Sequence, residues 1–450
     1  MKLRSGVTTL MTAIVAVGCI GDRDLEAPGA GDIDLTTAEQ WVGETEIRIG
    51  SIDDPEQALS TIGHVVIGPG GELFVSQPES GDIRVFNTDG KLSRVIGRRG
   101  KGPGEFENVS YIGFKGDTLF ASDDGLERVS YFSPNGKFWR TDSWRVAGGS
   151  GPRLANSGTI MYLTTTPHVP LPDGTGLAEV AGVPFSTGSP DRPDLVRSIG
   201  PWNTPYLHVD SHGEVMDTIV QIPERWAILT VVSGNKKAVF PLVLGAESFV
   251  KAAFPLASAA ESFAAVMRDG RGVVVVDMPV ETHDEVGTFK LLLIDPSGDS
   301  VFTRTVEYVP VPTPDETTER IAQRLHQSRP NGPGASAIAK SLRESGLIPG
   351  RLPPVSALAV AQDGSIWLRR EDPLGDSILW NVFSGHDGSI AAIRLPAGDS
   401  VIAARDDVVV ALARDELDVP YLTRYRLNRS FPRKEGLPSG QSSAKLNNEH

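Results

Sequence analysis

Short runs in which apolar and polar residues alternate, each followed by a turn signal, recur along most of the chain. The stretches 71–97 and 117–143 carry the same pattern at an offset of 46 positions, so that Leu73 corresponds to Leu119. Alternation with a period of two, rich in β-branched and aromatic residues, is typical of β-strands. Each stretch also contains an Asp-Gly or Asn-Gly turn, which favours a tight hairpin because these residues accept a positive φ. The pattern therefore predicts a repeated unit built from antiparallel strands.

Weaker copies of this unit follow at 158–215, 271–300, 364–390 and 407–427. The first of these, which is the third unit of the series, is lengthened by an insertion near 165–205. The sixth copy lacks its last strand, and the early strand-like run 44–50 would supply it by closing a ring. Propeller blades are four-stranded repeats of about 40–50 residues. We therefore expect an all-β fold, a six-bladed β-propeller over residues 44–427.

One insertion has helical periodicity. Residues 313–328 begin with Thr313, followed by a proline and by Glu316 three positions on, which is the pattern of a capping box. Apolar residues spaced four apart follow there and again in 335–345, before a glycine that ends the second segment. We expect a helical hairpin, residues 313–347, between blades four and five.

The first residues have the order of a secretion signal. Lys2 and Arg4 precede an apolar run at 7–17, which is shorter than the ~20 residues that span a bilayer. The ending Ala-Val-Gly-Cys resembles the bacterial lipobox, and this resemblance implies removal of residues 1–18 and acylation of Cys19. A plain signal peptide with an incidental cysteine is the alternative.

Composition limits the remaining possibilities. The net charge is -14, which argues against a nucleic-acid partner because nucleic-acid binders present basic surfaces. Cys19 is the only cysteine, so the fold has no disulfide.

Residues 19–43 are polar with scattered glycine and proline and predict a flexible tether. Residues 428–450 lack periodicity and predict a disordered tail.

The basic stretch 97–106, Gly-Arg-Arg-Gly-Lys-Gly-Pro-Gly-Glu-Phe, raises the question of a phosphate-binding loop. A P-loop requires Gly-Lys followed by Ser or Thr at the start of a helix, whereas Lys101 is followed by Gly102 and then by a predicted strand. We expect a structural turn that carries the chain from the outer strand of blade one to the inner strand of blade two.

With these residues in view, the chain resembles two related groups. The stretch at 97–106 and the turns before it resemble the NHL-type repeat. The closing residues 414–427, the helical insertion and the lipobox resemble the bacterial six-bladed β-propeller lipoproteins. The resemblance implies the fold and a place in the cell envelope, lipid-anchored, in the outer membrane. It implies little about activity, because propellers host many unrelated functions.

Candidate chemistry lies in the loops of one face. Blade connectors and the loops between second and third strands share a face, and it carries a set of charged residues that we take as the expected binding face: Asp123, Asp124, Asp277, His283, Asp284, Trp367, Arg369, Arg370 and Asp415. Its carboxylates would suit Ca²⁺, and a solvated acidic rim is the alternative. Trp367 and Arg369 are the expected anchors for a partner. Inter-blade pairing is the alternative for the two arginines.

Two functional classes remain open. The first is a non-catalytic binding or scaffold module, anchored to the membrane, for an envelope protein or a glycan. The second is a metal-dependent propeller enzyme, lactonase- or lyase-like, with its site in the central funnel. We expect binding, because the chain has only eight histidines and no Gly-x-Ser-x-Gly or His-Glu-x-x-His motif.

Overall fold

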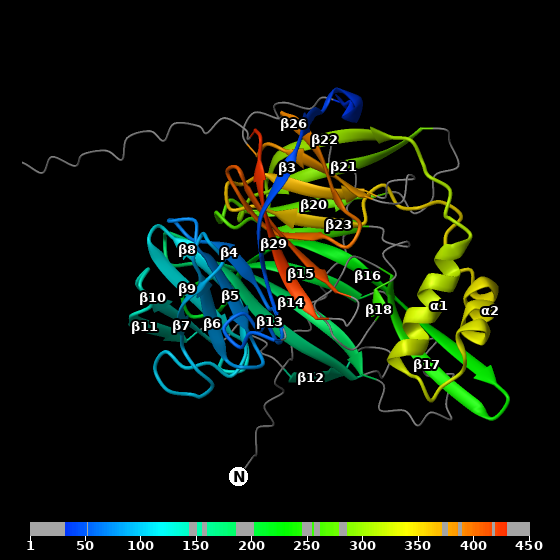
Figure 1. Ribbon diagram of the computed structural model, residues 1–450, viewed down its shortest axis with the longest axis horizontal. Helices are drawn as coiled ribbons and strands as arrows, with labels where there is room; N and C mark the ends of the chain where they lie inside the picture. Colours follow the sequence, from blue (N-terminus) through cyan, green and yellow to red (C-terminus); the bar gives the residue numbers. More distant parts are fainter. Residues whose placement is uncertain are drawn as a thin grey trace, which may run out of the picture.

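The structure is a computed structural model, and it describes residues 32–51, 53–143, 151–154, 160–185, 202–244, 254–255, 262–278, 286–370, 377–385, 389–415 and 419–429. Strands in these ranges form six separate sheets, arranged as the blades of a six-bladed β-propeller (Figure 1). The predicted signal peptide, Cys19 and residues 430–450 of the predicted tail lie outside the described residues.

Blades 1 and 2 are plain four-stranded antiparallel sheets. Blade 1 contains β4 (Val65–Ile67), β5 (Leu73–Gln77), β6 (Asp82–Phe86) and β7 (Leu92–Ile96). Blade 2 contains β8 (Val109–Lys115), β9 (Thr118–Asp123), β10 (Arg128–Phe132) and β11 (Phe138–Ser143). Leu73 pairs with Phe86 in the first, and Leu119 pairs with Phe132 in the second. The repeat seen in the sequence is therefore a repeat of strand register.

Blade 3 belongs to a much larger sheet of seven strands. They are β12 (Gly151–Leu154), β13 (Ile160–Pro170), β14 (Gly176–Phe185), β15 (Trp202–Val209), β16 (Val215–Ser233), β17 (Lys236–Leu244) and β18 (Phe254–Pro255). The expected insertion near 165–205 is only part of the extra chain. The strands themselves are lengthened, and β16 continues into a β16–β17 ribbon that extends beyond the blade.

Blades 4, 5 and 6 take strands from both ends of the chain. Blade 4 contains β19 (Ser262–Val266), β20 (Val273–Asp277), β21 (Gly287–Ile294) and β22 (Ser300–Tyr308). Blade 5 contains β23 (Ala357–Val360), β24 (Ile366–Arg370), β25 (Ser377–Phe383) and β26 (Ile390–Pro396). Blade 6 contains β27 (Ser400–Arg405), β28 (Val408–Arg414), β29 (Pro420–Leu427) and, as its outer strand, β3 (Gly43–Ile49). The early strand therefore closes the ring as expected.

The residues before β3 form a strap along the rim, and this corrects the expected tether for residues 32–43. β1 (Asp32–Ile33) pairs in parallel with β22, a short 3-10 helix η1 (Leu35–Thr37) follows, and β2 (Glu39–Trp41) pairs in parallel with β26. The strap ends at Val42, whose N–H and carbonyl bond the side chain and N–H of Asn428 at 2.9 and 3.0 Å. Asn428, at the start of the expected disordered tail, is therefore held in place.

The hydrophobic core consists of six layers, one between each pair of neighbouring blades. Each buried cluster combines residues of two adjacent blades, and the sixth joins blade 6 back to blade 1. Burial of apolar surface contributes about 25 cal/mol per Å². The fold is therefore held by contacts between blades on both faces of every sheet, and the ring is closed.

A helical hairpin leaves the ring between blades 4 and 5, where the sequence placed it. It contains α1 (Glu316–Ser328) and α2 (Ala335–Ser345), which lie side by side next to the β16–β17 ribbon (Figure 1). The capping box does not form. Asp315 occupies the cap position without a side-chain bond, and the Thr313 hydroxyl donates instead to the carbonyl of Pro349 at 2.7 Å. That bond closes the neck of the hairpin.

Candidate functional site

The strand directions divide the disc into two faces. Turns between first and second strands and between third and fourth strands lie on one face, the turn face. Blade connectors and the loops between second and third strands lie on the other, the connector face. Both the helical hairpin and the extended β16–β17 ribbon leave the disc on the connector face. The two insertions therefore meet on the side where the sequence placed the working surface.

The basic loop at 97–106 uses its own charges internally. Arg98 donates to the carboxylate of Glu105 at 2.8 Å, and the same carboxylate accepts the N–H of Gly102 at 2.8 Å. These two donors hold the pKa of Glu105 below its usual range. Arg128 of β10 donates to the carbonyls of Lys101, Gly102 and Glu105. The loop is a structural turn, as expected, and its Arg98 and Gly102 donors are already bonded to Glu105.

Two acids of the expected binding face hold this same connector in place. Asp123 is fully buried, and its carboxylate accepts the backbone N–H groups of Glu107, Asn108 and Leu126 at 2.7, 3.1 and 3.0 Å. Asp124 accepts the hydroxyl of Ser110 at 2.6 Å. A carboxylate that already accepts three N–H groups has little capacity left for a ligand. The structure therefore corrects the expectation for Asp123.

Trp367 is also not the surface anchor that the sequence suggested. Its side chain is 2% exposed, its indole N–H donates to Ser365 Oγ at 3.0 Å, and its ring meets Trp380 edge-on at 6.4 Å. It lies in the core between blades 5 and 6. The reason is that both faces of a blade are covered by neighbouring blades, so the successive residues Ile366, Trp367 and Leu368 of β24 are all buried.

The remaining expected residues are spread around the ring. Arg369 and Arg370 end β24. Burial lowers the pKa of Arg370, although the nearby Tyr308 opposes this shift. Asp277 accepts the hydroxyl of Ser262 at 3.1 Å, and Asp415 accepts the N–H of Val419 at 2.9 Å. His283 and Asp284 lie outside the described residues. Within the described ranges, no three His, Cys, Asp or Glu side chains gather as metal ligands would.

The centre of the disc is crossed by one arginine. Arg268 follows β19 and donates to the carbonyls of Val360, Ile402 and Val65, at 2.8, 3.0 and 3.4 Å. These carbonyls belong to the inner strands of three other blades or to their immediate ends, so the guanidinium ties four blades together. Beside it, Tyr111 stacks on His64 with ring centroids 4.0 Å apart, and burial raises the pKa of Tyr111.

The helical hairpin is held as a rigid projection by a core of its own. This core is made of α1, α2 and the β16–β17 ribbon, with Leu229, Val231 and Ala238 from the ribbon packed against Leu325 and Leu342 of the helices. At the neck, Thr313 N–H bonds the Gly350 carbonyl at 3.0 Å. The hairpin is therefore fixed at its base and along one side, and the side chains on the polar side of α1 are exposed.

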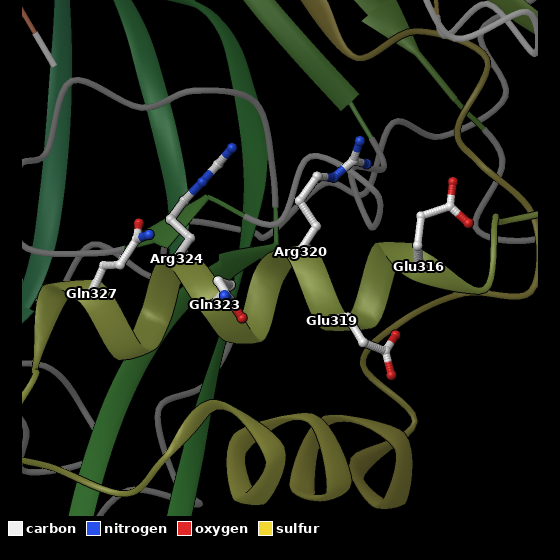
Figure 2. Close-up of a pocket in the computed structure, with 6 residues that line it drawn as sticks. All are labelled: Glu316, Glu319, Arg320, Gln323, Arg324 and Gln327. Atoms are coloured by element: carbon white, nitrogen blue, oxygen red, sulfur yellow. The ribbon is translucent and has the colours of Figure 1, made fainter. Parts of the chain in front are cut away.

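A cavity of about 430 Å³ lies along that polar side of α1 (Figure 2). The described side chains that line it are all exposed and all polar: Glu316, Glu319, Arg320, Gln323, Arg324 and Gln327. Figure 2 shows Arg320 and Arg324 pointing to the same side of the helix, away from α2, whereas Glu319 points toward α2. Glu319 forms an ion pair with Arg343 of α2.

Sequence reasoning missed this polar stripe, although its signal was present. Glu316, Arg320 and Arg324 recur every four residues, and so do Glu319, Gln323 and Gln327, which places both rows on one side of a helix. The prediction used the apolar spacing of the same segment to place the hairpin. What it lacked was the ribbon, whose packing decides which side of α1 stays exposed.

Comparison with known proteins agrees with the fold. A family model described as a 6-bladed beta-propeller matches residues 56–146, which cover blades 1 and 2. No curated protein matches the chain. Among the helices that the structure describes, none has the length and apolar character needed to cross a membrane.

Solved structures resemble the chain only loosely. A protein from Bacteroides fragilis is 12% identical with a TM-score of 0.38, over 89% of this chain and 98% of that one. A member of the DUF4221 family from Bacteroides vulgatus is 9% identical with a TM-score of 0.38, over 87% and 99%. The catalytically inactive virginiamycin B lyase from Staphylococcus aureus is 10% identical with a TM-score of 0.30, over 81% and 94%. Superpositions this loose carry nothing about activity.

Proposed function

We propose that this protein is an extracytoplasmic binding module, in which a rigid β-propeller presents the helical hairpin and the β16–β17 ribbon to an envelope protein or a glycan. The observation that supports this most is the projection itself. Two insertions from separate parts of the chain share one core and leave the polar side of α1 exposed beside a cavity. Neither insertion is needed to close the ring.

Pre-organisation is the physical reason that this arrangement suits binding. A loop that is disordered when free loses conformational entropy when a partner orders it, and that loss weakens association. Here the hairpin is fixed by the ribbon along its length and by the Thr313–Gly350 bond at its neck. The surface that a partner would contact is therefore already ordered in the free protein, so binding loses little conformational entropy there.

The anchoring remains part of the proposal. Acylation of Cys19 would hold the module at the outer membrane, since two or more acyl chains bind a bilayer stably where one is marginal. Fractionation of cells that express either the wild type or Cys19→Ser tests the lipid anchoring. Equal recovery of both proteins in the soluble fraction would contradict anchoring.

Bound Ca²⁺ at the acidic connector face remains a proposal as well, and calorimetric titration tests it.

The central experiment removes the projection while keeping the ring. Residues 314–349 are replaced by Asn-Gly, because Thr313 and Gly350 are already hydrogen-bonded at 3.0 Å and need only a two-residue hairpin turn between them. Leu229→Thr and Val231→Thr accompany the deletion, because the ribbon would otherwise expose the apolar side chains that the helices cover. Envelope extracts are then passed over the wild type and the deletion variant.

We expect the deletion variant to fold, with a thermal midpoint close to that of the wild type, and to lose the partners that the wild type captures. Capture of the same partners by both would show that the projection is not the binding surface. Metal-dependent hydrolysis of lactones or esters by the purified protein would replace the binding function with the enzymatic alternative.

A further inference from the structure

We infer that the polar stripe of α1 is a binding site for an acidic saccharide, with Arg320 and Arg324 holding a carboxylate of the sugar. This inference rests on the proposed function, because it names the ligand class of the same surface. The stripe is defined as Glu316, Arg320, Gln323, Arg324 and Gln327, the residues that line the cavity other than Glu319 (Figure 2).

The two arginines stand out because they have no partner in the described part of the protein. No described residue forms a hydrogen bond or an ion pair with the guanidinium of Arg320 or of Arg324. Other arginines of the protein are used, as in the pairs Arg424–Glu46 at 2.8 Å and Arg98–Glu105 at 2.7 Å. Glu316 lies one turn before Arg320 in the same row, but no ion pair joins the two in the described part of the protein.

The spacing of Arg320 and Arg324 indicates which kind of ligand would reduce the repulsion between their charges. Like charges four residues apart on a helix repel each other by about 0.2–0.5 kcal/mol. Glu316, one turn before Arg320, offsets part of this charge, and Glu319 in the adjacent row is bound by Arg343 of α2. Arg324 has no acidic residue three or four positions away. A ligand carboxylate between Arg320 and Arg324 would supply the missing negative charge, and a guanidinium binds a carboxylate through two parallel hydrogen bonds.

The other residues of the stripe favour a sugar over a peptide. The side chains of Gln323 and Gln327 each offer an amide donor and an amide acceptor, which match the hydroxyl groups of a saccharide. Peptide and protein partners are held by buried aromatic anchors as well as by arginine. The described lining of the cavity contains no apolar side chain, so the aromatic anchor has no counterpart among these residues.

The test is calorimetric titration of the full chain with trigalacturonate, which carries one carboxylate on each sugar, and with its fully methyl-esterified form, which has the same rings without the charge. The test variant is Arg320→Gln with Arg324→Gln. The control variant is Lys340→Gln with Lys290→Gln, which removes the same charge from exposed positions outside the stripe. Circular dichroism and thermal midpoints establish that both variants are folded.

We expect the acid to bind the wild type and the control alike. The test variant should bind it about tenfold or more weakly, since each lost charge-assisted bond is worth about a factor of ten. The methyl ester should bind the wild type as weakly as the acid binds the test variant, and salt should weaken the acid complex.

Three results would overturn the inference: no binding of trigalacturonate by the wild type, equal binding by the test variant, or equal binding of the methyl ester. Tighter binding of hexaglutamate than of trigalacturonate would transfer the site to acidic peptides and remove the saccharide assignment. The experiments distinguish failure of the saccharide site from failure of the proposed binding function. If the hairpin deletion abolishes partner capture and the arginine variant does not, the binding surface stands and this site falls.

Discussion

Tyr425 of β29 donates its hydroxyl to the carboxylate of Asp399, which precedes β27, so that the connector into blade 6 is tied to the third strand of that blade. Both residues are buried. Burial raises the pKa of Asp399, although the Tyr425 hydroxyl opposes this, and burial together with Asp399 raises the pKa of Tyr425. Folding therefore favours the protonated form of the Asp399 carboxyl group.

The first prediction follows from the sign of that shift. A carboxyl group whose pKa is raised by folding stabilises the fold when it is protonated, and this contribution is lost as the pH rises from about 4 through the folded value. Asp399→Asn keeps an acceptor for Tyr425 without the charge. We expect it to be at least as stable as the wild type at pH 7, with the difference in free energy of unfolding shrinking toward pH 4.

Urea unfolding at both pH values measures this difference, and Tyr425→Phe is the matched control. Tyr425→Phe leaves the carboxylate without its donor, and should cost about 1–3 kcal/mol at pH 7. A marked loss of stability in Asp399→Asn at pH 7 would mean that the ionised carboxylate itself stabilises the fold.

A second prediction concerns Tyr131 in β10, whose pKa burial raises from 10.0 to about 12. The unfolded phenol ionises near pH 10 while the folded one remains neutral, so the stability that it contributes is lost as the pH rises from 10 toward 12. Between about pH 9 and pH 11, the free energy of unfolding of the wild type should fall more steeply than that of Tyr131→Phe. Parallel pH profiles of the two proteins would contradict burial of the phenol.

The central arginine gives a third prediction. Arg268→Met keeps the length of the side chain but leaves the carbonyls of Val360, Ile402 and Val65 without their donor. An unsatisfied buried polar group costs about 1–3 kcal/mol, so we expect a loss of several kcal/mol in urea unfolding. Arg320→Met is the control, because it changes an exposed arginine without a described partner and should stay within about 0.5 kcal/mol. Equal stability of the two variants would mean that the ring does not need its central tie.

The strap gives a fourth prediction. Trp41 is 5% exposed and packs in the core between blades 5 and 6, whereas its neighbour Val42 is 58% exposed. Trp41→Ala should cost about 3–5 kcal/mol, as large core truncations do, and Val42→Ala less than about 0.5 kcal/mol. Proteolysis should also cut the chain before β3 faster in Trp41→Ala. If the tryptophan variant kept the stability and protease resistance of the wild type, residues 32–41 would act as the tether that the sequence suggested.

The fold could be predicted because its signal is local and repeated. The pairing of Phe86 with Leu92 depends on the Asp-Gly turn between β6 and β7. The matching Asn-Gly turn 46 residues later sets the pairing of Phe132 with Phe138, because one turn is enough to set the register of a hairpin. The strap could not be predicted in this way. Residues 32–41 contain strands of two and three residues, and their order comes from pairing with the outer edges of β22 and β26 and from the burial of Ile33 and Trp41 against distant blades.

The site could be predicted only in its location. Topology placed the hairpin on the connector face, but the burial of Trp367 and the use of Asp123 as a backbone acceptor depend on contacts with neighbouring segments. In a propeller both faces of a strand are covered, so alternation does not separate exposed from buried positions as it does in a sheet with one solvated face. The residues that proved exposed, Arg320 and Arg324, carry no motif of their own.

The pairing of β3 with β29 has a consequence for the order in which the chain can be completed. Ile49 pairs with Leu422, so the first strand of the ring finds its partner only when almost the whole polypeptide has left the ribosome. Until then, the apolar side of β3 and the facing side of blade 1 have nothing to cover them. A product that terminates before residue 420 keeps this seam open, and open seams of apolar strand are what proteases and chaperones recognise. The fold thereby distinguishes finished chains from unfinished ones.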